Sequence, residues 1–334
     1  MAKQLLSLLD LAARRGSDKE IGLVQQIVNY APEINLITGR TIPGTFTEAK
    51  VQVGISQGGA FRSVNAGAIP GAATYEKRRF NAYFFDSQLQ IDEAELVAAN
   101  QQGDSLGDLQ ADEVASALQD KAIKFSQQFY AGLGLNNAGF PGLLDLLNIY
   151  SKVVDSRTGQ GIVNVVDAGG GTGAKGGQVE CVWYVWVHPQ AVHFLLGGNK
   201  AIDINPWVWQ YVNDPNPKNA NGRFRAMLSN ISGFIGLACA HPWGVTCIKN
   251  ISAQAPWTDA LSAQLHSFYP AGIVPTHCFA TTRARATLQQ TRTVTLFGQA
   301  GVKPDQATIA PIPTVDIQGV PIYPTDGIQL TARF

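Results

Sequence analysis

Two strand-forming runs separated by a segment of small residues constrain the fold of this chain more than any other feature. The runs are TFTEAKVQVGISQ, from Thr45 to Gln57, and TYEKRRFNAYFFDSQLQI, from Thr74 to Ile91. The segment between them reads GGAFRSVNAGAIPGAA. Alternation of polar with apolar or β-branched residues is typical of strands, and glycine, proline and asparagine are typical of turns. The pattern therefore predicts a long two-stranded ribbon with a flexible tip.

The balance of charge restricts the kind of partner that the chain can have. Charged residues make up 15% of the 334 residues, and the 25 basic side chains equal the 25 acidic ones. An ordinary domain carries about 25% charged residues, and the cores of protein interfaces are depleted in charge. The deficit favours a chain whose surface meets other subunits. The zero net charge argues against a global field that would attract nucleic acid or an anionic membrane.

Helical periodicity is clearest in the second hundred residues. Val114, Leu118, Ala122, Phe125 and Phe129 recur at helical spacing, which predicts a helix from an N-cap at Asp108 to about Tyr130, roughly 35 Å long. Gly132 and Gly134 are expected to end it. Shorter helices are expected over Leu5–Ala12, from the Ser17 and Glu20 capping box up to a stop at Pro32, and over Trp257–Phe268 and Thr281–Gln290.

The region from Ile162 to Ile251 is rich in aromatic and β-branched residues and is predicted to form strands. Its longest uncharged stretch, Asn230 to Cys247, has the length of a membrane span but contains His241, Pro242 and three glycines. We therefore expect it to form one or two buried strands. The beginning of the chain, MAKQLLSLLDLAARRG, is not expected to be a signal peptide, because Asp10 interrupts its leucines and arginines follow.

One motif suggests a serine hydrolase. GISQGG, at Gly54 to Gly59, matches the G-x-S-x-G nucleophile elbow and would make Ser56 the nucleophile. That elbow requires several sheet strands before it and a helix after it. Only about fifty largely helical residues precede Ser56, and the glycines and proline that follow would break a helix. The context therefore favours an ordinary serine, and the hydrolase stays an alternative.

A second motif suggests a nucleotide-binding loop. VNVVDAGGGTGAKGG contains G-x-G-x-x-G at Gly171, Gly173 and Gly176, after a predicted strand. A phosphate cradle needs the N-terminus of a helix directly behind its glycines. The next residues, QVECVWYVWV, have the composition of a strand instead. The loop is therefore predicted to be a hairpin connection, with no cofactor.

The remaining reactive side chains lack the spacing of a metal or catalytic site. The four cysteines, with His241 and His277, show no paired ligand spacing and are interpreted as reduced, buried residues: Cys181, Cys239, Cys247 and Cys278. The acids Asp92, Glu93, Glu95, Asp112 and Glu113 are expected on exposed faces. The basic run from Lys77 to Arg79 is expected to divide its charges between two faces of a strand, which suits ion pairs between subunits.

The order of these parts resembles the major capsid proteins of tailed bacteriophages with the Hong Kong 97 capsid fold. IPGTFTEAKVQVGISQGGAFRSVNAGAIPGAATYEKRRF resembles the E-loop of a podophage-type capsid family. VWYVWVHPQAVHFLLGGNKA and GRFRAMLSNISGFIGLACAHPWGVTCIKNI resemble its central strands. IVPTHCFATTRARATLQQ and IQGVPIYPTDGI resemble later segments, although the GRFRAMLSNIS strands come after IVPTHCFA in better-known members and before it here.

The resemblance implies an α+β fold with an N-terminal arm, an extended E-loop ribbon, a peripheral domain with a long spine helix, and an axial domain. The peripheral and axial domains are both expected to be discontinuous. The implied boundaries are 1–42 for the arm, 43–88 for the E-loop, 89–135 and about 222–253 for the peripheral domain, about 108–131 for the spine helix, and about 136–221 and 254–334 for the axial domain.

The resemblance also implies a function without an active site. The chain would self-assemble into hexamers and pentamers of an icosahedral shell around double-stranded DNA. Its expected partners are further copies of itself, a portal protein, scaffolding and decoration proteins, and packaged DNA held by weak non-specific contact, with no membrane, metal or cofactor. It would be made and assembled in the bacterial cytoplasm and reside in the virion capsid. An encapsulin-like compartment and a Ser56 hydrolase are the alternatives.

Overall fold

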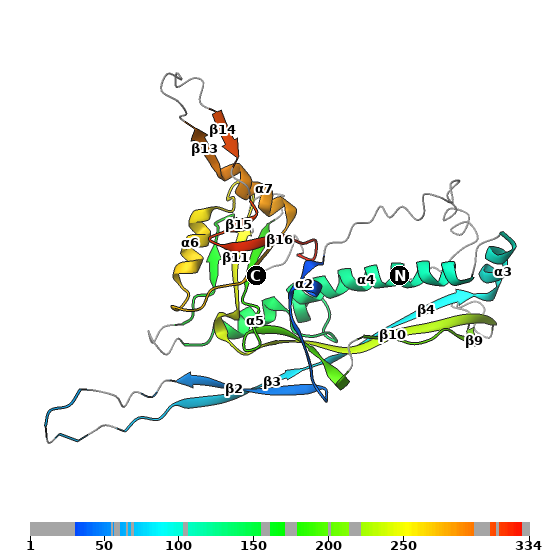
Figure 1. Cartoon of the computed structure of the whole chain (residues 1–334), viewed down its shortest axis with the longest axis horizontal. Helices are drawn as coiled ribbons and strands as arrows, with labels where there is room; N and C mark the ends of the chain where they lie inside the picture. Colours follow the sequence, from blue (N-terminus) through cyan, green and yellow to red (C-terminus); the bar gives the residue numbers. More distant parts are fainter. Residues whose placement is uncertain are drawn as a thin grey trace.

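The computed structural model describes residues 31–54, 56, 61–64, 66–67, 70–102, 106–154, 161–170, 179–199, 202–213, 222–296, 308–311 and 314–328. The molecule has three visible parts: a narrow ribbon, a long helix lying along an extended sheet, and a compact body of strands and helices (Figure 1). The helices predicted before residue 31 lie outside the described residues.

The ribbon consists of β2 (Phe46–Gly54) and β3 (Thr74–Asn81), paired antiparallel with Phe46 opposite Asn81. The predicted strand from Thr74 to Ile91 is wrong in one respect, because Ala82 divides it. The Ala82 amide donates to the carbonyl oxygen of Thr45 at 2.7 Å and closes the base of the ribbon. The chain then continues as β4 (Tyr83–Asp92), which leaves the ribbon and joins the sheet of the body.

The extended sheet is organised around one strand, β10 (Arg223–Cys239). β4 pairs antiparallel along one edge of β10, from Ile235–Tyr83 to Ala226–Asp92. Three shorter strands share its other edge: β9 (Val208–Asn213), β8 (Ile202–Ile204) and β7 (Val192–Leu196). The short β1 (Gly39–Thr41) adds to β7 in parallel.

Two helices follow β4: α3 (Glu93–Gln102) lies at the far end of this sheet, and α4 (Leu106–Ala131) runs back along it. The predicted long helix is confirmed, although it begins two residues before Asp108. Its end is confirmed too, because Gly132 has φ +60° in a 3₁₀ turn over Gly132–Gly134. At Gly132 a Cβ would lie 2.3 Å from the Gly142 nitrogen, so only glycine fits there.

Near the N-terminus, Pro32 begins the short helix α2 (Pro32–Leu36). The helix predicted to stop at Pro32 lies outside the described residues. Proline is favoured at the first position of a helix, because its fixed φ suits the helix and its absent N–H would have no partner there. α2 contacts α4, and its Glu33 accepts a hydrogen bond from Ser126 near the end of that helix.

The compact body contains a second sheet in the order β15-β16-β12-β6-β11-β5. These strands are β15 (Asp316–Ile317), β16 (Val320–Pro324), β12 (His277–Ala280), β6 (Glu180–Val185), β11 (Val245–Ile251) and β5 (Val165–Asp167). Helices α6 (Asp259–Ser267) and α7 (Thr282–Thr291) cover one face. The other face meets α5 (Leu143–Tyr150) and the end of α4.

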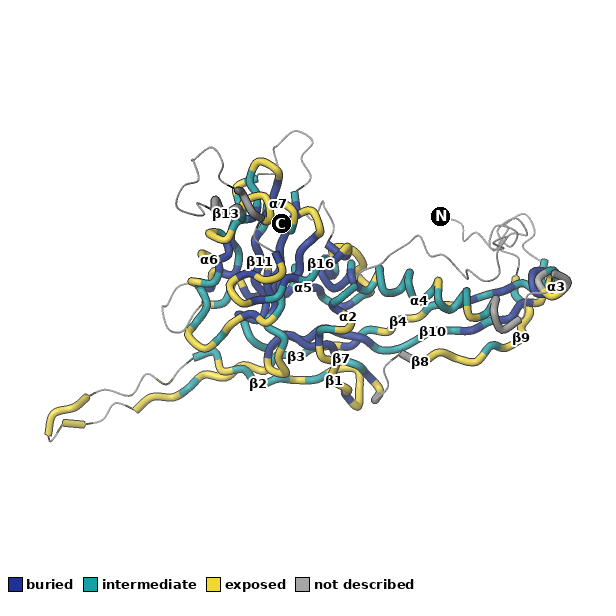
Figure 2. The backbone as a smooth tube through the Cα atoms, turned by 45° about the horizontal axis from the view of Figure 1, so that its top comes forward, coloured by how far each residue is buried: buried dark blue, intermediate teal, exposed yellow. Residues whose placement is uncertain are grey.

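The strand β6 lies between two hydrophobic cores, and all six of its residues are buried. Cys181, Trp183 and Val185 face α4, α5 and β7, whereas Val182 and Tyr184 face α6 and α7. Successive side chains of a strand point to opposite faces, so one strand supplies both cores. Figure 2 shows the result, with burial concentrated in the body and along β10 and exposure along the ribbon.

The uncharged stretch from Asn230 to Cys247 forms buried strands, as predicted: the end of β10, a 3₁₀ turn over Pro242–Gly244, and the start of β11. In the described part of the chain, no helix has the length and apolarity needed to span a membrane. A hairpin of β13 (Thr293–Leu296) and β14 (Thr308–Pro311) projects from the body after α7 (Figure 1).

Candidate interaction surface: the ribbon and its anchor

Ser56 does not lie in the context of a nucleophile elbow. The strand before it, β2, pairs only with β3 in a two-stranded sheet, and Ser56 is exposed beyond its end. The described residues that follow, from Phe61 to Ala73, contain no helix. The ribbon sequence from Phe46 to Asn81 also contains no histidine that could act as a base. The prediction of an ordinary serine is consistent with this geometry.

The glycine-rich loop at Gly171–Gly176 lies outside the described residues. The residues after it do form a strand, β6, rather than the helix that a phosphate cradle requires. That part of the prediction is confirmed. β6 enters the centre of the second sheet directly, between β12 and β11.

The four cysteines are free and buried, as their interpretation required. The Cys239 thiol donates to the His241 carbonyl oxygen at 3.2 Å, so this contact joins the sulfur to the backbone of His241 and not to its imidazole ring. Burial raises the pKa of Cys239 to about 12. In the described ranges, no group of three or more metal-ligating side chains is present.

One of the predicted exposed acids is buried. The side chain of Glu95 is 8% exposed, and its carboxylate accepts the Asp92 amide at 3.4 Å where β4 turns into α3. A carboxylate three residues into a helix commonly accepts an amide of the preceding turn. Glu93 in the same turn is half-exposed and accepts a hydrogen bond from Arg225 at 3.0 Å. These acids therefore cap and tie the helix to β10.

The basic run on β3 divides between two faces, as predicted, and one member anchors the ribbon. Lys77 and Arg79 are exposed, whereas Arg78 is partly buried against the body. Arg78 Nη1 donates to the carbonyl oxygen of Ala240 at 3.1 Å, and its guanidinium lies 5.0 Å from the centre of the Tyr150 ring. Tyr150 in turn donates to the Cys239 carbonyl oxygen. Arg78 is therefore used within the subunit.

Small residues allow the ribbon base to cross β10 closely. A Cβ on Gly236 would lie 2.4 Å from the carbonyl oxygen of Asn81, and one on Gly197 would lie 2.7 Å from the Cβ of Phe234. The amide of Gly198 donates to the Gly44 carbonyl oxygen at 3.3 Å. The close approach fixes the direction in which the ribbon leaves the body.

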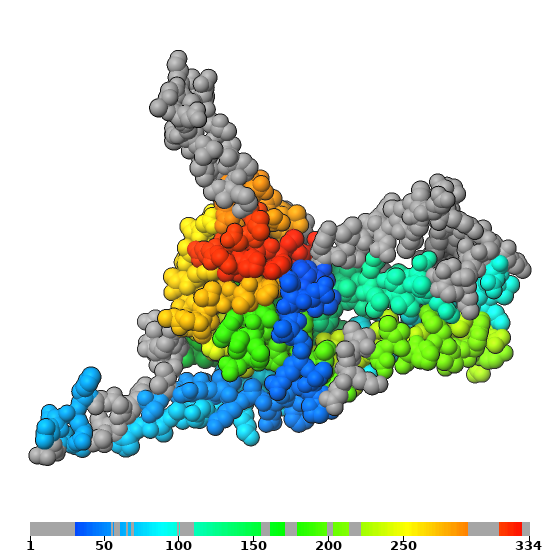
Figure 3. All heavy atoms as spheres, viewed as in Figure 1, coloured from blue at the N-terminus to red at the C-terminus, as the bar shows by residue number. Residues whose placement is uncertain are grey.

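The described part of the ribbon tip is exposed and contains large apolar side chains. Phe61 is 111% exposed and Val64 is 91% exposed, so neither is covered by its own subunit. Arg62 Nη1 donates to the Ala66 carbonyl oxygen at 2.6 Å and holds a local turn. In the space-filling view the ribbon extends beyond the body (Figure 3). Exposed aromatic side chains of this kind are typical of interface anchors.

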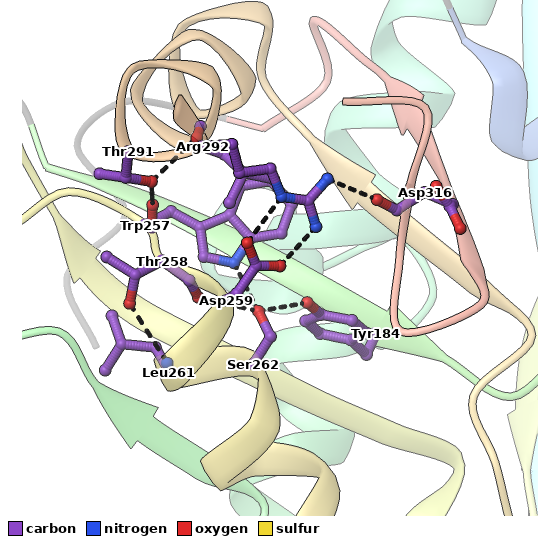
Figure 4. A network of polar contacts seen from close by, with 10 residues as sticks. Tyr184, Trp257, Thr258, Asp259, Leu261, Ser262, Thr291, Arg292 and Asp316 are labelled. Carbon is purple, nitrogen blue, oxygen red and sulfur yellow. Dashed lines mark hydrogen bonds and ion pairs between the residues drawn. The ribbon is translucent and has the colours of Figure 1, made fainter. Parts of the chain in front are cut away.

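A polar network holds the outer face of the body together. Arg292 donates to both carboxylate oxygens of Asp259 on α6, with Nε to Oδ2 at 2.7 Å, and to the Asp316 carbonyl oxygen at 2.8 Å (Figure 4). Beneath it, Trp257 Nε1 and the Tyr184 hydroxyl both donate to Ser262 Oγ, each at 2.9 Å. The hydrogen-bonded Asp259 raises the pKa of Arg292. These side chains join α6, α7, β6 and β15 without forming a reactive site.

Glu33 is a buried carboxylate that the sequence did not reveal. It is 0% exposed, and its Oε1 accepts hydroxyl hydrogens from Ser126 at 2.7 Å and from Thr325 at 2.8 Å. The three residues come from α2, α4 and the segment after β16. No spacing in the sequence could have indicated this, because the partners are 93 and 292 residues away.

Comparison with known proteins shows the fold. The sequence matches no protein-family model, and no curated protein is significantly similar to it. A chain from the near-atomic cryo-EM structure of bacteriophage Epsilon15 superposes with a TM-score of 0.69 at 14% identity, covering 98% of this chain and 96% of its own. A chain of the bacteriophage JBD30 capsid gives 0.55 at 9% identity, with 97% and 99% covered. The chain therefore has the α+β fold of the Hong Kong 97-type phage capsid structures.

Proposed function

We propose that the chain is the major capsid protein of a tailed bacteriophage, a subunit that assembles into hexamers and pentamers of an icosahedral shell around double-stranded DNA. The observation that carries this proposal is the match to the Epsilon15 chain over 98% of this chain, at a TM-score of 0.69. The match includes the long ribbon. A ribbon that extends away from its own subunit favours contact with another molecule. Its exposed Phe61 supports an intermolecular role.

In this proposal each part of the molecule has a place in the shell. Residues 1–42 form the arm and 43–88 the E-loop, which lies across a neighbouring subunit. Residues 89–135 and about 222–253 form the peripheral domain with α4 as its spine, and about 136–221 and 254–334 form the axial domain at the capsomer centre. The sheet pairing supports the joining of distant segments, because β10 pairs with β4 across more than a hundred residues.

The proposal requires no catalytic residue, metal or cofactor. Ser56 on a two-stranded ribbon lacks the sheet and helix of a hydrolase elbow, which supports a structural role. The partners would be further copies of the chain, a portal protein, and scaffolding and decoration proteins, with DNA held by weak non-specific contact. The bacterial cytoplasm would be the site of assembly and the virion capsid the final location.

Negative-stain electron microscopy of the purified recombinant chain, alone and co-expressed with the neighbouring genes of its source, tests the proposal. Closed particles or capsomer rings are the expected result. A chain that stays monomeric under both conditions contradicts it. Particles that contain a protein cargo and never DNA would instead indicate an encapsulin-like compartment.

Deletion of residues Gly58–Ala73 is a second test of the same proposal. The subunit should fold, because the described tip residues bury no large side chain, but closed shells should not form. Circular dichroism checks the folding and microscopy checks the shells. Normal shells from this deletion would show that the ribbon tip is not needed for assembly.

A further inference from the structure

A groove at the free edge of β4 is suited to an aromatic side chain from outside the subunit. It has a volume of about 360 Å³ and lies between α4, the start of β4 and the loop at residues 136–140. Its aromatic lining includes Tyr83, Phe85, Phe125 and Phe140, of which the last two rings lie 5.4 Å apart. Since a cavity of about 150 Å³ admits benzene, the groove has room for a phenylalanine ring.

The groove also has one acidic group that is open to a partner. Its cations, Lys121 and Lys124, both contact Asp120, at 2.8 and 2.9 Å. Asp86 also lines the groove and is exposed. An incoming segment that combines an aromatic ring with an adjacent cation could therefore fill the aromatic lining and pair with Asp86.

The ribbon tip has this combination of groups. Phe61 is fully exposed, and Arg62 beside it is the only charged residue between Lys50 and Tyr75. The hydrogen bond from Arg62 to the Ala66 carbonyl uses one of the five guanidinium N–H donors, which leaves others for a carboxylate. The ring, the cation and the turn that presents them thus lie at one end of the ribbon.

The tip cannot reach the groove of its own subunit. The groove begins at Tyr83, directly after the base of the ribbon at Ala82, and the ribbon leads away from it (Figure 1). The nine residues of β2 span about 30 Å at 3.4 Å per residue, and the tip lies beyond them. A ribbon tip that fills the groove must therefore belong to another molecule.

We propose that Phe61 of one subunit inserts into the β4 groove of a second copy of the chain, with Arg62 paired to Asp86. This inference rests on the proposed function, because it requires that copies of the chain assemble. It assigns the contact to one residue pair and one pocket. Phe61 supplies the buried anchor, and the ion pair sets which part of the tip enters.

Disulfide trapping tests the contact in assembled particles. We expect the double variant Phe61→Cys with Ala138→Cys to give a ladder of covalent multimers on a non-reducing gel, because Ala138 is an exposed residue of the groove lining. The native cysteines are all buried, which keeps the background low. The matched control, Phe61→Cys with Ala263→Cys on the exposed face of α6, should stay monomeric on the gel.

Charge exchange provides a readout that a merely structural role would not give. Arg62→Asp and Asp86→Arg should each lower the yield of particles by about tenfold, as loss of a central interface contact does. The double variant should return to within about threefold of the wild type, because the pair is restored with reversed polarity. Subunit folding, followed by circular dichroism, should be unchanged in all three.

The outcomes separate this inference from the proposed function. Shells that form normally, with no ladder from the groove pair and no recovery in the double variant, would overturn the groove contact and leave the capsid proposal standing. If the wild-type chain never assembles, the proposed function fails and the contact fails with it. A ladder together with recovery supports both.

Discussion

At the scale of single residues, Glu33 joins three segments that are far apart in the sequence. Its Oε1 accepts hydroxyl groups from α4 and from the segment after β16, and the groups bonded to it are hydroxyls rather than cations. Burial of a carboxylate is costly unless hydrogen bonds replace water. The nearby Tyr130 is affected as well, because burial, and next the Glu33 charge, raises the pKa of that phenol well above its usual value.

Replacement of Glu33 by alanine should destabilise the subunit by about 2–4 kcal/mol, because the Ser126 and Thr325 hydroxyls lose their acceptor in a buried site. Glu33→Gln should retain most of the stability, because the amide oxygen can still accept both hydrogen bonds. Urea unfolding of the unassembled subunit measures the difference. Equal losses in both variants would show that the negative charge itself is required.

His241 is a second residue whose ionisation is coupled to the fold. Its Nδ1 accepts the Trp243 amide at 3.2 Å, and its ring lies edge-on to Trp186 at 5.1 Å. Burial first, and the nearby Arg78 guanidinium second, lower the pKa of His241 below 6.5. His188 stacks on the same Trp186 ring, and Tyr150 contacts Arg78, so His241 lies at the anchor of the ribbon.

Acid should therefore weaken the subunit. As the pH falls through about 6.5, the unfolded chain binds the proton before the folded chain does, so stability present above that pH is lost. The pKa values of His193, His266 and His277 shift in the same direction, because burial lowers each of them.

The variant His241→Asn tests the share of His241 in this effect. It keeps an acceptor for the Trp243 amide and should reduce the slope of unfolding free energy against pH, by less than about 1.4 kcal/mol per pH unit. Urea titrations between pH 5 and 8 measure it, and an unchanged slope would exclude His241.

At the scale of elements, the crossing of β10 by the ribbon base depends on the absence of a side chain at Gly236. Gly236→Ala should destabilise the subunit by about 1–3 kcal/mol, because the new Cβ would meet the Asn81 carbonyl oxygen at 2.4 Å and force the strands apart. Gly67→Ala, in open space at the tip, is the matched control and should be neutral. Thermal melting compares the two. Similar melting temperatures would show that the crossing can widen without cost.

The elements also show how far the sequence could predict this fold. Local patterns predicted α4 and its glycine stop, the strand that follows the glycine-rich loop, and the strands of β10 and β11. They did not predict α5, a short helix of Leu143–Tyr150, or the break at Ala82. The break depends on a hydrogen bond to Thr45 and on pairing of β4 with a strand more than a hundred residues away, neither of which leaves a local signal.

The interaction surface was predicted in outline only. The small-residue tip and the alternation along β3 indicated a ribbon, and both are visible in the sequence. The anchor through Arg78 and the groove beside β4 depend on side chains from distant segments. Tertiary packing alone brings Ala240, Tyr150 and the ribbon together, so residue types near Arg78 could not reveal its partners.

At the scale of the whole molecule, the exposed tip should be the first site of proteolysis in the unassembled subunit. Arg62 is the only trypsin site between Lys50 and Lys77, and it lies in the exposed tip. We expect an early cut after Arg62 whose two fragments stay associated, because β4 pairs with β10 along its full length. Mass spectrometry with size-exclusion chromatography checks both points. A first cut inside the body would show that the body opens before the tip.

The continuity of β3 with β4 through Ala82 also has a mechanical consequence. A pull on the ribbon tip acts along the axis of β4, parallel to its partner β10. The hydrogen bonds from Tyr83–Ile235 to Asp92–Ala226 are then loaded in shear, all together, instead of being opened one after another. The ribbon and the sheet therefore bear tension as one continuous element. A force applied at the tip is carried across the molecule to the far end of β10.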